Sequence, residues 1–232
     1  MRDLIKNQKY WDQFVEKKAQ DLSQIDGMVA ANGLNEENME QTVKFIEYER
    51  LCLAIAMYSA GMDIDLCKET FVKSLNNLSE RKWKLEIYVD IVWYVSLSVL
   101  FNLGENAYNK LLDIMPESLL EDKIIAPMMG YLRNVDLKGK TFAMADPYAH
   151  LDELFDNNNN SSLQADIIRT YLSKYWYKGH DEEAWYNLHK SKNLYFGYWS
   201  FESAALAKVL KIDDSYICNE KYYPYDLAHY AK

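Results

Sequence analysis

Three acidic residues near the C-terminus have the types and spacing that could support chemistry. The stretch GYWSFESAALAKVLKIDDS, residues 197–215, contains Glu202, Asp213 and Asp214. Carboxylates in such a group act as general acids and bases, or as ligands of a hard metal ion. A zinc site needs further ligands about three or four residues apart, or brought together by the fold, and no histidine stands at that spacing here. Four scattered histidines are expected to be surface or capping residues: His150, His180, His189 and His229.

The same acids also have structural roles in a helical core, and this interpretation is favoured. A helix is predicted over residues 201–210 with Ser200 as its cap, which places Glu202 in the first turn, where the helix dipole favours a carboxylate. The run 213–215 can cap the next turn. Aromatic residues crowd this region, and buried tyrosine hydroxyls need acceptors such as Glu202 or Asp213. We therefore expect no catalytic residue and no metal site.

Signatures of common enzymes are missing from the sequence. It contains no H-E-x-x-H, no G-x-x-x-x-G-K-[ST], no G-x-G-x-x-G and no G-x-S-x-G, so no cofactor is expected. The run Glu121-Asp122-Lys123 resembles part of a nuclease motif, but that motif belongs on a strand and this segment is expected to be helix or loop. A non-enzymatic protein is favoured. The enzymatic alternative is a hydrolase or metal-dependent enzyme built on Glu202, Asp213 and Asp214.

The composition of the chain restricts its partners. The 232 residues include 26 Lys and Arg and 35 Asp and Glu, which gives a net charge of −9 at pH 7. A nucleic-acid-binding protein usually carries a basic stripe, and the sequence shows none. The acidity either serves solubility or points to a basic protein partner. No nucleic acid is expected as a ligand.

Cysteine usage and hydropathy predict a cytoplasmic protein without a membrane anchor. Cys52, Cys67 and Cys218 are odd in number and form no C-x-x-C pair, so we expect reduced cysteines. The N-terminus has no apolar signal core. The most apolar run, residues 91–101, is far shorter than the ~20 residues that span a bilayer.

Helical spacing of apolar residues recurs along nearly the whole chain, and only 8 Gly and 4 Pro interrupt it. The N-terminal half predicts five helices. The first ends at Asp26-Gly27, the second begins after Asn35 and ends at Gly61, and Asp63 caps the third. The fourth, about residues 80–103, is apolar almost all round and is expected to be central. The fifth covers residues 105–115.

The C-terminal half predicts further helices. They cover residues 123–132 on either side of Pro127, a segment capped by Ser161 or Ser162, residues 182–190, residues 201–210, and a last turn opened by Pro224. The fold class is therefore all-α: a bundle of antiparallel helix pairs in two closely packed helical subdomains. The expected domains are residues 1–116 and residues 117–232.

Acidic groups provide the candidates for a docking surface. The first group shares one side of the second helix, and the other groups lie in loops that the fold could bring together. For the first group a solvated face with favourable charges near a helix N-terminus is the preferred explanation. The candidates are Glu36, Glu37, Glu40, Glu47, Asp152, Glu153, Asp156, Asp181, Glu182 and Glu183.

Two segments also carry a family resemblance. GYWSFESAALAKVLKIDDS at 197–215, followed by YYPYDLA at 222–228, resembles the C-terminal signature of the PoNi-type immunity proteins, and AMYSAGMDIDLCKETF at 56–71 is similar to their first domain. Two signatures in the expected order are far more specific than one. The matching residues are Tyr58, Gly61, Tyr198, Trp199, Phe201, Glu202, Asp213, Asp214, Tyr223, Pro224 and Asp226.

The resemblance implies an all-helical protein without catalytic activity. Such proteins accompany bacterial DNase toxins of the PoNe type, which specialised secretion delivers into competing cells. The immunity protein binds its cognate toxin and protects the producer. We expect the shared residues to define the fold, because residues common to a family cannot select one toxin. The alternative function is a helical interaction scaffold for another protein partner.

Overall fold

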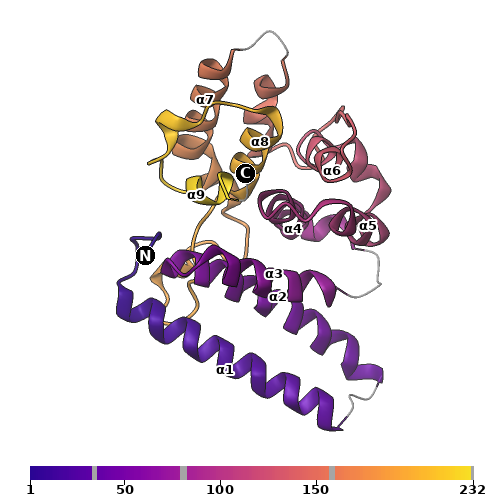
Figure 1. Ribbon diagram of the computed structural model, residues 1–232, viewed down its shortest axis with the longest axis vertical. Helices are drawn as coiled ribbons and strands as arrows, with labels where there is room; N and C mark the ends of the chain where they lie inside the picture. Colours follow the sequence, from indigo (N-terminus) through magenta and orange to yellow (C-terminus); the bar gives the residue numbers. More distant parts are fainter. Residues whose placement is uncertain (33–35, 79–82, 157–159, 231–232) are drawn as a thin grey trace. The chain divides into compact units, whose positions relative to one another are not determined.

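The computed structural model describes residues 1–32, 36–78, 83–156 and 160–230, with the backbone alone described at residues 32 and 36–40. It confirms the all-α fold, since the described ranges contain helices and one isolated backbone bridge, Asp122 with Thr141, but no strand. The α-helices, labelled in Figure 1, are α1 (Gln8–Asn32), α2 (Glu36–Ala60), α3 (Ile64–Asn76), α4 (Tyr88–Leu100), α5 (Gly104–Ile114), α6 (Ile125–Arg133), α7 (Ser161–Thr170), α8 (Phe201–Leu210) and α9 (Tyr225–Ala228). Short 3-10 helices are η1 (Leu85–Ile87), η2 (Glu117–Glu121), η3 (Tyr148–Phe155), η5 (Lys178–His180), η6 (Leu188–Lys190) and η7 (Ser215–Ile217), and η4 (Tyr171–Trp176) is a π-helix.

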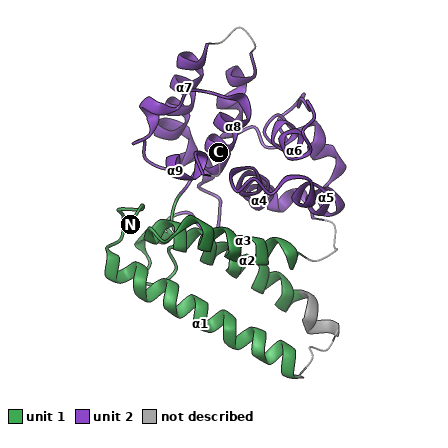
Figure 2. Ribbon diagram, viewed as in Figure 1, with its two compact units in different colours: residues 1–80, 187–198 green, residues 81–186, 199–232 purple. Residues whose placement is uncertain are grey.

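The chain forms two compact units, coloured separately in Figure 2. Unit 1 contains residues 1–80 and 187–198, and unit 2 contains residues 81–186 and 199–232. The boundary expected between residues 116 and 117 lies inside unit 2, because α5 packs against α6. That boundary stays a prediction about which segments fold independently.

Unit 1 is a layer of three helices in which α2 packs against both α1 and α3. The segment 187–198 joins them although it comes from late in the chain. Ser59 on α2 donates a hydrogen bond to the carbonyl oxygen of Phe196 (3.0 Å), and the Tyr195 hydroxyl donates to the carboxylate of Asp3. The buried ring of Trp11 lies 5.6 Å from that of Tyr195. The late segment is therefore part of the core of unit 1.

Unit 2 is built around α4, which packs against α5, α6 and α8. As predicted, α4 is buried almost all round, although it begins at Tyr88 rather than near residue 80. Pro127 lies in the first turn of α6, where a missing backbone N–H costs no helical hydrogen bond. The α7 helix continues into the π-helix η4, a feature that the sequence pattern did not indicate.

Several predicted helix ends are confirmed. Asp63 caps α3 by accepting a hydrogen bond from the Asp65 N–H (2.8 Å), and Gly61 ends α2 with a left-handed φ of 85°. Helix α8 has the predicted bounds, with Ser200 before it. The Ser200 hydroxyl, however, donates to Glu202 and makes no capping bond. The predicted cap Asn35 lies outside the described residues.

Three predictions about local structure are wrong. The α1 helix does not end at Asp26-Gly27 but continues to Asn32, because Gly27 is tolerated inside a long helix. Asn160 caps α7 by accepting from the Leu163 N–H (2.8 Å), in place of Ser161 or Ser162. No α-helix forms over 182–190, because Asn187 has a left-handed φ of 63° that interrupts it.

The contrast between two glycines of unit 1 gives a stability prediction. Gly27→Ala should raise the free energy of unfolding by about 0.5–1 kcal/mol, because Gly27 is helical and a methyl group there meets no atom within 4 Å. Gly61→Ala should lower it by at least about 1–2 kcal/mol, because φ is positive and the new Cβ would lie 2.2 Å from the Met1 backbone nitrogen. Urea unfolding of both variants measures the two effects, and equal stability of the two variants would contradict this account.

Candidate functional site

Glu202 is a buried hydrogen-bond acceptor in the first turn of α8. Its Oε1 atom accepts from the Tyr171 hydroxyl (3.0 Å) and from the Ser200 hydroxyl (2.7 Å). Burial raises the pKa of this carboxyl, and the hydrogen bonds from Ser200 and Tyr171 oppose that shift. This geometry confirms the interpretation of Glu202 as a tyrosine acceptor.

The two adjacent aspartates have different roles. Asp214 is buried and accepts from the Tyr223 hydroxyl (2.6 Å), and its other oxygen lies 2.8 Å from Nε2 of His229. Asp213 is exposed and accepts from the Ser215 N–H (3.1 Å). Hydrogen bonding to the Ser215 side chain, and then to this N–H, lowers the pKa of Asp213. The expected turn cap is confirmed, but the tyrosine acceptor is Asp214 rather than Asp213.

Asp122 is a third buried carboxylate of unit 2, and sequence reasoning missed its role. One oxygen accepts from the Tyr88 hydroxyl (3.0 Å) and from the N–H groups of Ile124 and Ile125 (2.9 Å each). The other oxygen accepts from the Ala143 N–H (2.8 Å). The acid of the Glu121-Asp122-Lys123 run therefore holds backbone around the start of α6. An aspartate two or three residues before a helix was the available signal.

His180 is buried, which corrects its expected place at the surface. Its Nδ1 atom lies 2.5 Å from the carbonyl oxygen of Trp176, and its Nε2 atom lies 3.1 Å from the Tyr148 hydroxyl. A neutral imidazole with the proton on Nδ1 satisfies both contacts, since Nε2 then accepts from Tyr148. Burial lowers the pKa of His180 to about 4. The histidine is thus a neutral connector in the core.

The described part of α2 does not show its acidic candidates together on one exposed face. Glu47 is buried, because α2 packs against helices on two sides. It therefore presents no carboxylate at an exposed face of the helix. The side chains of Glu36, Glu37 and Glu40 lie outside the described residues.

The remaining acidic candidates lie in unit 2. Asp152, Glu153 and Asp156 are exposed, and Asp152 forms an ion pair with Lys123. Asp181 and Glu182 are exposed, whereas Glu183 is half-buried.

These two acidic groups lie toward different ends of η3. At one end Tyr148 contacts His180, next to 181–183, and at the other the Leu154 carbonyl accepts from Gln164 in α7 (3.0 Å). That the fold joins these two groups in one surface stays a prediction.

Most residues of the family signature are buried. Tyr58, Tyr198, Trp199, Phe201, Glu202, Asp214, Tyr223 and Pro224 lie in the interior of their units, and Gly61, Asp213 and Asp226 are exposed. Arg2 places its guanidinium 4.6 Å from the centre of the Tyr58 ring and donates to the Tyr58 carbonyl (3.1 Å). This burial is consistent with the proposed role of these residues in defining the fold.

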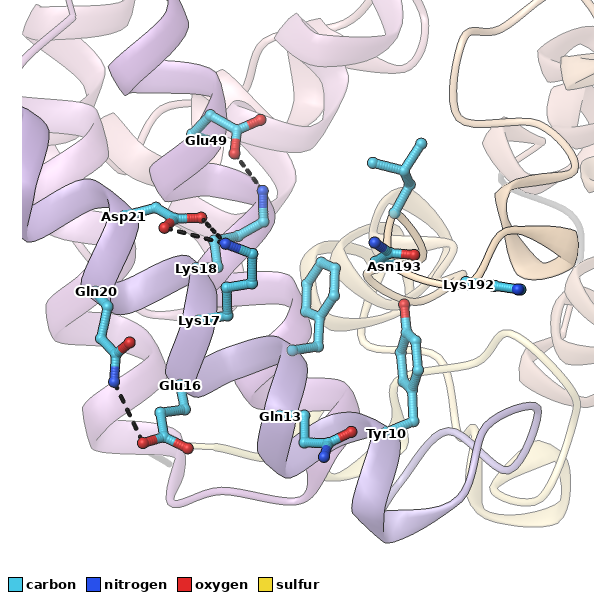
Figure 3. Close-up of a pocket in the computed structure, with 12 residues that line it drawn as sticks. Tyr10, Gln13, Glu16, Lys17, Lys18, Gln20, Asp21, Glu49, Lys192 and Asn193 are labelled. Atoms are coloured by element: carbon cyan, nitrogen blue, oxygen red, sulfur yellow. Dashed lines mark hydrogen bonds and ion pairs between the residues drawn. The ribbon is translucent and has the colours of Figure 1, made fainter.

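Unit 1 contains a groove of about 820 Å³ between α1 and the segment 187–198 (Figure 3). Tyr10 and Phe14 line it with rings stacked 5.6 Å apart, together with the exposed side chain of Leu194. Two of its three lysines, Lys17 and Lys18, form ion pairs with acids of the same groove, Asp21 and Glu49.

The described part of the chain assembles neither a metal centre nor a membrane span. No three His, Cys, Asp or Glu side chains of the described residues gather closely enough to hold a metal ion. None of the helices in the described ranges combines the length and the apolar character that crossing a membrane requires. The three cysteines are free thiols.

Comparison with known proteins gives matches along nearly the whole chain. Residues 2–113 match the family described as PoNe immunity protein (PoNi), N-terminal, and residues 120–227 match PoNe immunity proteins (PoNi), C-terminal. The crystal structure of protein PA2201 from Pseudomonas aeruginosa is similar in fold, with a TM-score of 0.66 and 14% sequence identity over 93% of this chain and 87% of that one. No curated protein sequence matched the chain.

The helical fold and the two matches define an immunity protein, a protein that protects a cell against a toxin. The chain belongs to the PoNe immunity protein (PoNi) family, as the resemblance in its sequence predicts, and its partner is a cognate toxin protein.

Substitution of Glu202 separates a hydrogen-bonding role from a role that needs charge. Glu202→Gln keeps an oxygen for Tyr171 and Ser200, so we expect a change of at most about 1 kcal/mol in the free energy of unfolding. Glu202→Ala leaves both hydroxyls without this acceptor and should cost about 2–4 kcal/mol. Urea unfolding measures both, with Asp113→Ala at an exposed position on α5 as control. Equal losses for Gln and Ala would contradict the acceptor role.

Asp90 in the first turn of α4 gives a pH prediction. Burial and then the charge of Glu183 raise the pKa of Asp90 to about 7, against about 4 in an unfolded chain. The folded state therefore holds a proton between about pH 4 and 7 that the unfolded state releases, so this group lowers stability as the pH rises through that range. Asp90→Asn should stabilise the protein at both pH 5 and pH 8, and by at least about 1 kcal/mol more at pH 8, since the proton is lost from the folded state only near pH 7.

Thermal unfolding of the Asp90 variant at the two pH values measures this effect. Asp113→Asn, at an exposed position on α5, is the control and should change the stability by less than about 0.5 kcal/mol. A stability gain from Asp90→Asn that is the same at pH 5 and pH 8 would show that Asp90 does not titrate in this way.

Proposed function

We propose that this immunity protein neutralises a DNase toxin by binding it as a stoichiometric, non-enzymatic inhibitor in the cytoplasm of the producing cell. The observation that carries the proposal is the match of two immunity-family segments, in order, over residues 2–113 and 120–227. The toxin would be one that specialised secretion, such as type VI secretion, delivers between competing bacteria.

The negative net charge of this protein supports a nuclease as its partner. A DNase must present positive charge to hold the phosphate backbone of its substrate. The immunity protein carries a net charge of −9, which speeds its association with a basic partner by electrostatic steering. Bound in or next to the active-site cleft, it excludes DNA from the toxin.

The structural roles of the buried carboxylates support inhibition by binding rather than by catalysis. The three buried carboxylates of unit 2 that accept from tyrosines are Glu202, Asp122 and Asp214, and each serves a different hydroxyl. Each of them accepts hydrogen bonds from other core residues, so a structural role accounts for all three. The exposed acids Asp152, Glu153, Asp156, Asp181 and Glu182 are the better toxin-binding candidates, and Glu36, Glu37 and Glu40 stay candidates on sequence grounds.

Plasmid cleavage tests the proposal. The DNase toxin encoded next to this protein would be incubated with plasmid and increasing molar ratios of the immunity protein. We expect cleavage to stop near a one-to-one ratio and a complex to elute from a sizing column. Undiminished cleavage without a complex would overturn the proposal. Binding to a partner that is not a nuclease would instead favour the interaction scaffold.

A further inference from the structure

Three partly exposed tyrosines of unit 2 form a continuous stack. The ring of Tyr177 lies 4.5 Å from that of Tyr186 at an angle of 28°, and 5.8 Å from that of Tyr222 at 17°. All three are half-buried. Because they come from two distant segments, the fold creates a surface, called here the tyrosine stack, that neither segment has alone.

Buried tryptophans hold the tyrosine stack in place. The Trp176 ring lies 4.7 Å from that of Tyr222 and 5.7 Å from that of Trp185, and both tryptophans are almost fully buried. Trp185 in turn lies 5.6 Å from Trp93 of α4. Packing against the tryptophans already restricts the tyrosine side chains. They therefore lose little conformational entropy when a partner covers their exposed side, which favours binding.

The backbone under the tyrosine stack is irregular at two places. Tyr222 has a φ of 73°, a left-handed conformation that is costly for a bulky side chain. Its carbonyl oxygen accepts from the Ser200 N–H (2.9 Å), which fixes this conformation. Tyr177 directly follows the π-helix η4, and such helices occur frequently at functional sites. Backbone strain of this kind concentrates where a side chain must be presented in one orientation for function.

The surroundings of the tyrosine stack favour a cationic partner. Asp181 and Glu182 are exposed in the turn between Tyr177 and Tyr186, and Glu220 is half-exposed before Tyr222. Burial raises the pKa of the Tyr186 hydroxyl, and electrostatic interactions with Tyr177, Asp181 and Tyr222 raise it further. The ammonium of Lys221 lies 4.6 Å from the centre of the Tyr222 ring, so a face of this stack already accepts a cation.

We propose that the tyrosine stack, with Asp181 and Glu182 at its edge, is the docking surface for a basic, arginine-bearing face of the toxin. This inference rests on the proposed function, because that function supplies a basic partner. Tyrosine and arginine dominate the binding energy of protein interfaces, since a tyrosine ring provides a rigid face for a guanidinium while nearby carboxylates pair with it. Bases of single-stranded DNA also stack on tyrosines, but the neighbouring carboxylates repel the phosphate backbone.

Three variants and a control test the docking surface. Tyr186→Ala and Tyr222→Asn each remove one ring, and asparagine tolerates the left-handed backbone at 222. Glu182→Lys reverses an exposed charge without touching the core. Tyr131→Ala is the matched control, since Tyr131 is an exposed tyrosine on α6, away from the stack in the sequence and 39% accessible. The probe is a catalytically inactivated form of the DNase encoded next to this protein.

Affinity and association rate are measured by biosensor for each variant that keeps the far-UV spectrum of the wild type. We expect each tyrosine variant to weaken binding at least about tenfold, and Glu182→Lys to slow association at low salt, with Tyr131→Ala unchanged. The exposed Glu182→Lys variant keeps the test decisive if a tyrosine variant fails to fold.

The outcomes separate this inference from the proposed function. If the wild type binds and inhibits the DNase while the tyrosine-stack variants bind equally well, the docking surface is wrong and the proposed function stands. If the wild type neither binds nor inhibits, both are wrong. Binding of a fluorescent single-stranded oligonucleotide, lost in Tyr186→Ala, would also overturn the inference, because it would assign the stack to nucleic acid.

Discussion

The hydrogen bond from a buried tyrosine to a buried carboxylate is the interaction on which this structure most depends. It occurs in unit 1 between Tyr195 and Asp3, and in unit 2 with Glu202, Asp122 and Asp214 as the acceptors. A buried hydroxyl without a partner costs about 1–3 kcal/mol, so a core rich in tyrosine must contain acceptors. These bonds also join distant segments: Asp3 is bonded to Tyr195, and Tyr171 to Glu202. Two of the three acids that suggest chemistry in the sequence, Glu202 and Asp214, are therefore acceptors that this core requires.

The sequence predicted the fold class well because helical periodicity and end signals are local. Asp63, Gly61 and the bounds of α8 follow from neighbouring residues alone. The local predictions that are wrong lie where tertiary packing overrides a local helix signal. Gly27 stays inside a helix, and the segment 182–190 forms turns while burying Trp185. The assignment of segment 187–198 to unit 1 depends on contacts with the first residues of the chain, which no local pattern contains.

The candidate surface was harder to predict than the core. An acidic run is visible in the sequence, but the burial of Glu47 depends on the fold. Tyr177 stacks on both Tyr186 and Tyr222, which joins positions 45 residues apart, and a left-handed tyrosine has no sequence signal.

The central claim is that this protein acts by binding and not by turnover. Native mass spectrometry of the toxin, incubated for hours with one tenth of a molar equivalent of the immunity protein, tests this claim directly. The account predicts that about one tenth of the toxin is found in a one-to-one complex, and that the remaining toxin is unchanged in mass and still cleaves DNA. A toxin population that is fully inactivated, or altered in mass, by the substoichiometric amount would show catalysis and would contradict the account.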